Sequence, residues 1–229
     1  MSYPIVLFDV DGTLLDSSGA GKRSLQRTFL ELHGIPDAFS GYDFVGCTDL
    51  GIVHDAFSTH LDRVPTDEEA DAVCERYLAH LEIELARPGV QVRMMPGIRV
   101  LLERLVEAGV TVGMATGNLR RGAYLKIGAV GLGALLPFGG FGSDSKDRAE
   151  LTRLAGARGR EARGEDIPSE RVLVVGDSPL DIQAGHAAGM PVLSVLTGWT
   201  PEEDLLALGP EHLLADLSDT DGVMRLIVG

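Results

Sequence analysis

Short apolar runs that each end in polar residues recur along this chain, and they limit its fold more than any other feature. Five of them are typical of strands buried on both faces: PIVLFDV (4–10), GVTVGMAT (109–116), RVLVVGD (171–177), MPVLSVLTG (190–198) and the shorter EHLLAD (211–216). Amphipathic patterns at 97–109 and 178–189 predict helices between them, the second with Ser178 as its N-cap. This alternation predicts an α/β fold, a parallel sheet with helices on both faces.

The polar residues at the strand ends are expected to meet at one edge of that sheet. Asp9 and Asp11 follow the first run, Thr116 ends the second and Asp177 ends the third. In parallel sheets, ligands bind outside the carboxyl ends of the strands. Convergent carboxylates repel one another unless a cation lies between them, and Mg²⁺ prefers such oxygen ligands. A hydroxyl with backbone N–H groups suits a phosphate oxygen, so the edge predicts a site for both.

Residues 16–92 interrupt the alternation. SSGAGKRSLQRTFLELHG and TDEEADAVCERYLAHLEIELARPG have helical patterns, and no convincing strand separates them. We therefore expect a discontinuous core domain made of residues 1–15 and 93–229, with a helical cap domain at 16–92. The Gly-rich stretch 131–147 is expected to be a loop with one short strand, and 157–166 to be charged surface.

Composition excludes several classes of partner. The formal net charge of −14 argues against nucleic acid and anionic membranes, which both need a basic face. No apolar stretch approaches the roughly 20 residues that a membrane helix requires, and the first residues lack a secretory signal pattern. Cys47 and Cys74 have no metal-binding spacing and are expected to be free thiols. We expect a cytoplasmic protein, monomeric or homodimeric.

Three motifs in order give the chain a family resemblance. They are DVDGT (9–13), the strand-end Thr116 in MATGN (114–118), and GDSPLD (176–181). The sequence resembles the haloacid dehalogenase superfamily, specifically phosphoglycolate-phosphatase-like members with a helical C1-type cap. The resemblance covers the whole chain. It implies a Rossmann-like doubly wound core with an inserted all-helical cap, and Mg²⁺-dependent hydrolysis of a small phosphomonoester through an aspartyl-phosphate intermediate.

The resemblance also implies roles for the residues of the first and last motifs. Asp9 is the nucleophile, while Asp11 is the general acid and then the general base. Asp11 then needs a raised pKa, and we expect it to be shielded from the metal charge. Asp9, the backbone carbonyl of Asp11 and Asp177 are the implied metal ligands.

The phosphate site implied by the resemblance includes Thr116, Gly117 and Asn118. The family places a Lys, often followed by Pro, in its third motif, but no such pair occurs here. Arg148 is the favoured substitute and Lys146 the alternative, with Asp181 holding the basic residue in place.

Two segments of the cap carry weaker predictions. Thr48 and Asp49 in GCTD (46–49) resemble a family segment near the substrate, although a Thr48 helix cap explains them equally well. GAGKR (19–23) does not fit a phosphate loop, because Asp16 and Arg23 stand where that loop needs Gly and Ser or Thr. Lys22 and Arg23 are expected on an exposed helix, with a substrate-facing position as the alternative.

Other functions within the superfamily remain open from the sequence. A phosphomutase shares all the motifs and differs in how the cap handles the phosphorylated intermediate. A dehalogenase needs no second aspartate, so Asp11 speaks against it, and a phosphonate hydrolase replaces that aspartate with a small residue. An inactive binding or regulatory relative would be expected to lack one of the acidic motif residues, which are all present here.

Overall fold

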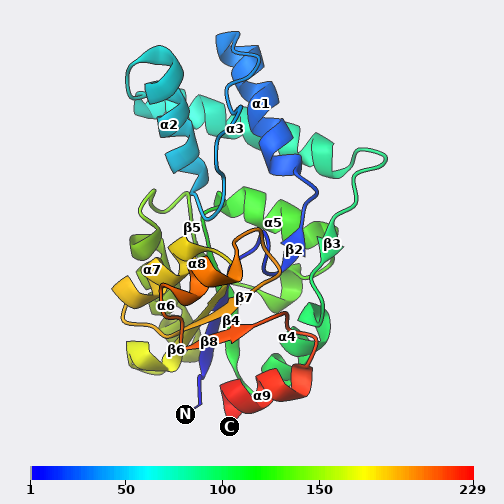
Figure 1. The fold of residues 1–229 in the computed structure, drawn as a ribbon, viewed down its shortest axis with the longest axis vertical. Helices are drawn as coiled ribbons and strands as arrows, with labels where there is room; N and C mark the ends of the chain where they lie inside the picture. The colour runs from blue at the N-terminus through cyan, green and yellow to red at the C-terminus, as the bar shows by residue number, and fades with distance from the viewer. Residues whose placement is uncertain (1) are drawn as a thin grey trace.

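A six-stranded parallel sheet forms the centre of the molecule in the computed structural model, which describes residues 2–229 (Figure 1). Ile5 of the central strand pairs with Thr111 on one side and Val172 on the other. The strands follow the order β5 (Gly139–Phe141), β4 (Thr111–Thr116), β1 (Ile5–Phe8), β6 (Val172–Gly176), β7 (Val192–Val195) and β8 (His212–Leu214).

Helices cover both faces of this sheet, because successive side chains of each strand point to opposite sides. Val6 and Phe8 of β1 belong to a core closed by α4 (Ile98–Glu107), α5 (Arg120–Ala129) and α9 (Thr220–Val228). Ile5 and Leu7 face the opposite core, closed by α6 (Arg148–Arg163), α7 (Pro179–Ala187) and α8 (Glu202–Leu206). The predicted doubly wound α/β architecture is confirmed.

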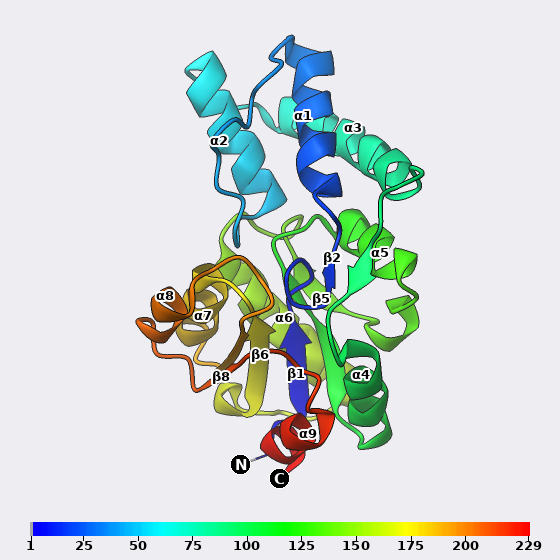
Figure 2. The ribbon, with the colours of Figure 1, turned by 45° about the vertical axis from the view of Figure 1, so that its right-hand side comes forward.

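Three helices stand apart above the carboxyl edge of the sheet (Figure 2). They are α1 (Ala20–His33), α2 (Asp49–Leu61) and α3 (Asp67–Leu85), and they pack around an apolar cluster with Phe29, Phe57 and Tyr77, which Leu119 of the sheet region also joins. The chain leaves and re-enters the sheet region through a two-stranded antiparallel pair, β2 (Leu15–Asp16) and β3 (Arg93–Met94), which the sequence pattern did not reveal. A division into two domains at 15/16 and 92/93 stays a prediction.

The stretch between the second and third strands follows its prediction closely. Residues 131–147 hold the short 3-10 turn η1 (Gly133–Leu135) and the single strand β5. The charged stretch 157–166 begins inside α6, where Arg158 pairs with Asp144 on the surface. A second 3-10 turn, η2 (Ser169–Arg171), leads into β6. Among residues 2–229, no helix has both the length and the apolar character to cross a membrane.

Candidate active site

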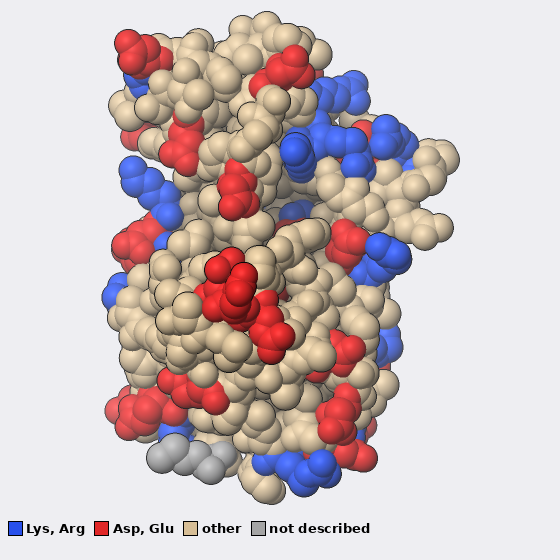
Figure 3. Space-filling view, in the orientation of Figure 1, with Lys and Arg blue, Asp and Glu red and all other residues tan. Residues whose placement is uncertain are grey.

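A cavity of about 390 Å³ lies between the carboxyl edge of the sheet and the three upper helices. The surface is hollowed at this level, and Lys and Arg side chains gather beside the hollow over the region of α1 and α3 (Figure 3). Most of the predicted site residues line the cavity: Asp9, Asp11, Asp49, Thr116, Gly117, Asn118, Arg148 and Asp177. The predicted convergence of strand ends therefore places these residues together in one cavity.

Arg148 binds two carboxylates at the base of this cavity. Its Nη2 atom lies 2.9 Å from Asp9 Oδ1 and 2.5 Å from Asp181 Oδ1. Asp147 caps the N-terminus of α6 by accepting the N–H of Ala149, which fixes Arg148 as the first residue of that helix. Of the two basic candidates, Arg148 is the buried residue beside Asp9, whereas Lys146 is exposed.

Asp181 is held by α7 as well as by Arg148. Ser178 caps this helix, as predicted, and the two residues form a reciprocal capping box in which Asp181 Oδ2 accepts from the backbone and hydroxyl of Ser178. Both carboxylate oxygens of Asp181 are thus engaged by protein donors. The arrangement orients Arg148 towards Asp9.

Asp177 lies in a space that only glycine neighbours leave open. Thr13 donates to its Oδ1 atom at 2.8 Å. A Cβ atom on Gly12, whose φ is +86°, would lie 2.4 Å from Asp177 Oδ2, and one on Gly198 would lie 1.8 Å from it. Neither distance is tolerable, so glycine at both positions leaves the space that this carboxylate oxygen occupies.

The acidic groups fit a bound divalent cation. Carboxylate oxygens of Asp9, Asp177 and Asp181 all lie within 4.8 Å of one another. Burial, opposed by Arg148 and reinforced by Asp181 and Asp11, raises the pKa of Asp9 to about 7. Burial and the same carboxylate crowding raise the pKa of Asp177 well above its usual range. One guanidinium therefore does not neutralise this cluster, and its hard oxygen donors suit Mg²⁺.

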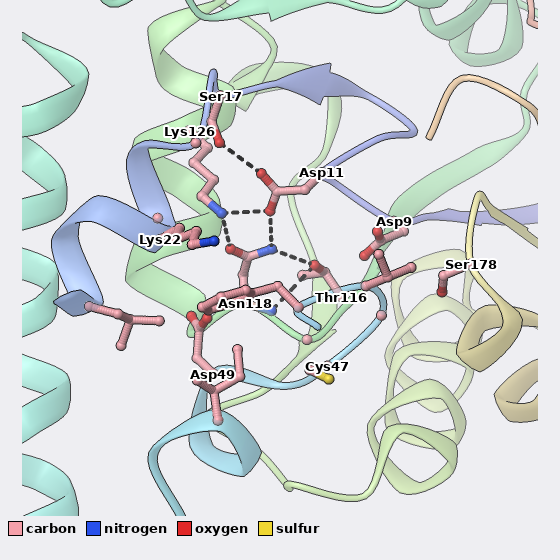
Figure 4. A pocket seen from close by; sticks show the side chains of 18 of the residues that line it. Asp9, Asp11, Ser17, Lys22, Cys47, Asp49, Thr116, Asn118, Lys126 and Ser178 are labelled. Carbon is pink, nitrogen blue, oxygen red and sulfur yellow. Dashed lines mark hydrogen bonds and ion pairs between the residues drawn. The ribbon is translucent and has the colours of Figure 1, made fainter. Parts of the chain in front are cut away.

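Asp11 belongs to a separate hydrogen-bonded group across the cavity (Figure 4). Its Oδ2 atom lies 2.5 Å from Lys126 Nζ and accepts from Asn118 Nδ2 at 2.9 Å, while Ser17 donates to its Oδ1 at 3.0 Å. Asn118 Oδ1 in turn accepts from Lys126, and Asn118 Nδ2 also reaches the hydroxyl of Thr116. The group links the first two motifs through side chains.

The expectation that the pKa of Asp11 is raised is wrong. Burial alone would raise it, but the ammonium of Lys126, with hydrogen bonds from Lys126, Asn118 and Ser17, lowers the pKa of Asp11 below its usual value. Lys126 was not among the predicted residues. It lies on α5, ten positions after Thr116, and shares the buried face of that helix with Ala123 and Ile127. A lysine on an otherwise apolar helix face was the available signal.

Thr48 and Asp49 join the start of α2 to the loops at the carboxyl edge of the sheet. Thr48 accepts the N–H of Gly51 as N-cap of α2, and its hydroxyl donates to the carbonyl of Lys146 at 3.1 Å. Asp49 Oδ2 accepts the N–H of Leu119 at 2.8 Å, and the backbone N–H of Asp49 donates to Gly117 O at 2.8 Å. A Cβ on Gly117 would lie 2.2 Å from the carbonyl of Cys47, so this close crossing requires glycine.

Lys22 and Arg23 point to different surroundings. Arg23 forms an ion pair with Glu84 of α3 at 2.9 Å. Lys22 lines the cavity, and its amine lies on the side of Asn118 and Lys126 (Figure 4). Lys22 is exposed, as predicted, and also lines the cavity, so both alternatives apply to it, whereas Arg23 is half-buried.

Known proteins resemble this chain along nearly its full length. A family model described as haloacid dehalogenase-like hydrolase matches residues 6–195. A phosphoglycolate phosphatase from Mesorhizobium japonicum is 30% identical over 210 residues, covering 87% of this chain and 86% of the relative. An N-acetylmuramic acid 6-phosphate phosphatase from Pseudomonas aeruginosa is 29% identical over 222 residues, covering 95% of this chain and 90% of the relative. The solved structure of a hydrolase from Pseudomonas syringae has a TM-score of 0.74 at 22% identity, covering 98% of this chain and 99% of that structure.

Proposed function

Because the chain belongs to the haloacid dehalogenase-like hydrolase family, we propose that it is a Mg²⁺-dependent phosphatase acting on a small phosphomonoester. The observation that carries this proposal is the buried Asp9 carboxylate, which lies beside Arg148 and the Asp177 carboxylate at one sheet edge. A carboxylate so placed can attack phosphorus, while the guanidinium offsets charge on the transferring group.

The substrate class follows from the relatives and the size of the cavity. Proteins similar to this chain over most of its length are phosphoglycolate phosphatases by name. A cavity of about 390 Å³ accommodates a small phosphorylated metabolite. We therefore propose a short phosphomonoester, with phosphoglycolate as the first candidate.

Asp9 and Asp177 are the side chains proposed to hold Mg²⁺, together with the backbone carbonyl of Asp11. Asp181 is assigned to positioning, since both of its oxygens already accept hydrogen bonds from Arg148 and Ser178. When bound, Mg²⁺ neutralises the carboxylates and polarises the phosphoryl group. Asp177 lines the cavity, with a carboxylate oxygen within 4.8 Å of one on Asp9, which supports this assignment.

The proposed reaction has two displacements at phosphorus. An Asp9 oxygen forms a bond to phosphorus as the bond to the ester oxygen breaks, and the departing oxygen takes a proton from Asp11. Water then attacks the acyl phosphate and transfers a proton to Asp11, which releases phosphate and restores Asp9. The hydroxyl of Thr116, with the backbone of Gly117 and Asn118, is proposed to bind phosphoryl oxygens throughout.

Asp11 is arranged for the second displacement. Its pKa is lowered by Lys126 and Asn118 despite burial, so the carboxylate is ionised and ready to act as a base. For the first displacement a proton must reach Asp11 from the bound monoanionic ester or from solvent. Movement of Asp11 away from Lys126 would favour that proton uptake, because it removes the main stabilisation of the charge.

We propose that residues 16–92 act as a cap that closes over the site. The apolar cluster that packs α1–α3 together and the two-strand crossing at β2 and β3 support this proposal, although Leu119 beside α5 also joins that cluster. Cys47 and Cys74 are free, which supports the expectation of a reducing, cytoplasmic setting. A monomer or homodimer remains our expectation.

Phosphate release from a panel of small phosphomonoesters, phosphoglycolate included, tests the proposed function. We expect turnover with Mg²⁺ and none after EDTA treatment, with activity restored when Mg²⁺ is added back. A folded protein that releases phosphate from no ester would contradict the proposal. Activity that needs a bisphosphate primer would indicate a phosphomutase instead.

A further inference from the structure

Lys126 is a buried cation that takes no direct part in the proposed reaction. Its side chain is 4% exposed, and it extends from the face of α5 that also buries Ala123 and Ile127. Burial of an ammonium group is costly unless the group is paired and hydrogen-bonded. Within residues 2–229 its ion-pair partner is Asp11, and its ammonium also donates to Asn118. The contacts of this lysine therefore end on two residues of the proposed site.

The side-chain amide of Asn118 is oriented by two charged neighbours. One end of an amide accepts hydrogen bonds and the other end donates them. The ammonium of Lys126 can only donate, so Asn118 Oδ1 faces it. The ionised carboxylate of Asp11 can only accept, so Asn118 Nδ2 faces its Oδ2 atom at 2.9 Å. Both neighbours therefore require the same orientation of the amide (Figure 4).

This orientation determines where the hydroxyl proton of Thr116 points. Thr116 Oγ1 accepts from Asn118 Nδ2 at 2.9 Å and from the backbone N–H of Asn118 at 3.4 Å. A hydroxyl oxygen has two acceptor positions and one proton. Because both acceptor positions are filled, the proton is available for donation. Thr116 donates it to Asp9, and this hydrogen bond lowers the pKa of Asp9 against the effect of burial.

The hydrogen bonds thus run in one direction from α5 to the proposed nucleophile. Lys126 donates to Asn118, and Asn118 donates to Thr116. Thr116 then donates to Asp9. With the amide turned over, Asn118 Oδ1 would face Thr116 and draw the hydroxyl proton away from Asp9. Successive hydrogen bonds in such a chain polarise and strengthen one another, so its direction matters for its last member.

The backbone around Asn118 is held independently of Lys126. The N–H of Gly142 donates to the carbonyl of Asn118 at 2.8 Å, and the N–H of Asp49 donates to the carbonyl of Gly117 at 2.8 Å. Loss of Lys126 is therefore expected to release the amide and the hydroxyl while the loop stays in place.

We propose that Lys126 is a positioning residue for phosphoryl transfer. By donating to Asn118 it sets the direction of the chain, so that the hydroxyl of Thr116 presents its proton to the nucleophile and then to a phosphoryl oxygen. The inference rests on the proposed phosphatase function and adds to it a residue outside the three sequence motifs. Lys126 touches neither the phosphoryl group nor the nucleophile and acts through the side chains between them.

Lys126→Met tests this role in the phosphate-release assay. Methionine is close to the lysine stem in length and suits the apolar face of α5. We expect kcat to fall about 10- to 100-fold, the usual range for residues that orient a functional group. Arg120→Met, which removes an exposed cation from the start of the same helix, should leave kcat unchanged. A wild-type kcat for Lys126→Met would overturn the proposal.

A double-mutant cycle with Thr116→Val separates a directed chain from general support of the fold. Valine resembles threonine in shape but has no hydroxyl, so in this background Lys126 has no proton to direct. The loss caused by Lys126→Met should then be several-fold smaller than in the natural chain. Some loss should persist, because Lys126 also holds Asp11. Losses that simply multiply would overturn the proposal.

Asn118→Asp tests the direction of the chain while keeping Lys126 and its ion pair. The new carboxylate still accepts from Lys126 but has no proton to donate to Thr116. We expect kcat to fall about 100-fold, as when a donor to the reacting group is lost. A wild-type kcat would show that the donation from Asn118 to Thr116 is not needed, and it would overturn the proposal.

Asn118 is the sole asparagine of the chain, which permits a test that needs no enzymatic activity. In protein labelled with 15N in its asparagine side chain, one NH2 pair reports the bonds to Asp11 and Thr116. We expect these protons to exchange with water several-fold faster in Lys126→Met than in the natural chain. Unchanged shifts and exchange would overturn the proposal. A clear change in a protein that hydrolyses no ester would uphold the chain and contradict the phosphatase function.

Discussion

Replacing Asp49 by Asn should stabilise the protein at neutral pH. Asp49 is buried at the N-terminus of α2, where its carboxylate accepts the N–H of Leu119 at 2.8 Å. Burial, opposed by Lys126 and by the Leu119 hydrogen bond and reinforced by Asp11, raises its pKa to about 6. Asn keeps an acceptor for Leu119 but carries no charge, so it removes only the cost of ionisation.

The magnitude follows from proton linkage. The pKa of Asp49 is 3.8 in the unfolded reference and about 6 in the native state, a difference of about two units. Because the folded pKa is the higher one, the native state keeps its proton longer. The contribution of protonated Asp49 to the free energy of unfolding is fully present below the unfolded pKa, and it is lost as pH rises through about 6. At about 1.4 kcal/mol per unit, the loss approaches 3 kcal/mol.

Urea unfolding of both proteins in EDTA, at about pH 4, 5, 6 and 7.5, measures this effect. The free energy of unfolding of Asp49→Asn minus that of wild type should rise with pH and level off above about pH 6. The difference cancels the contributions of other titrating groups. Asp71→Asn, on the exposed face of α3, is the charge control. A difference that stays flat with pH, or that falls as pH rises, would refute the reasoning.

Three further predictions concern Arg148, the metal site and the N-cap of α3. Arg148→Met should lower kcat by about 100- to 1,000-fold in the phosphate-release assay, because charge on the transferring group loses its partner; activity within a few-fold of wild type would contradict this role. Gly198→Ala places a Cβ against Asp177 Oδ2 and should raise the Mg²⁺ concentration needed for half-maximal activity, whereas an unchanged Mg²⁺ titration would argue against Asp177 as a ligand. Thr66→Ala removes the capping box of α3 and should lower the free energy of unfolding in urea by about 1 kcal/mol, with kcat unchanged. An unchanged free energy of unfolding would show that this N-cap does not stabilise the protein.

The sheet and its polar edge were predictable because their signals are local. Each buried strand is a short apolar run, and parallel strands bring their carboxyl ends together whatever their order along the chain. Asp9, Thr116 and Asp177 could therefore be grouped without knowing any contact. Ser178 was equally readable, since a helix N-cap depends on its immediate neighbours.

Residues that reach the site from helices were harder to predict. Lys126 extends a long side chain from α5 to Asp11, and no local pattern encodes where its amine ends. The pKa of Asp11 is lowered where a rise was expected, because Lys126 and the hydrogen bonds from Asn118 and Ser17 together outweigh burial. Tyr77 resembles any aromatic core residue until it is seen to line the cavity. The pair β2 and β3 has two residues per strand, too few for a periodic signal.

The most direct test of the central claim is to locate the phosphoryl group on the enzyme. Protein mixed with excess phosphoglycolate and Mg²⁺ is quenched in acid, and the peptide that carries residues 5–15 is analysed by mass spectrometry. We predict a hydroxylamine-sensitive acyl phosphate on Asp9, absent from Asp9→Asn, which should also release no phosphate. Phosphate release by Asp9→Asn at the wild-type rate, or a phosphoryl group on another residue, would contradict the account.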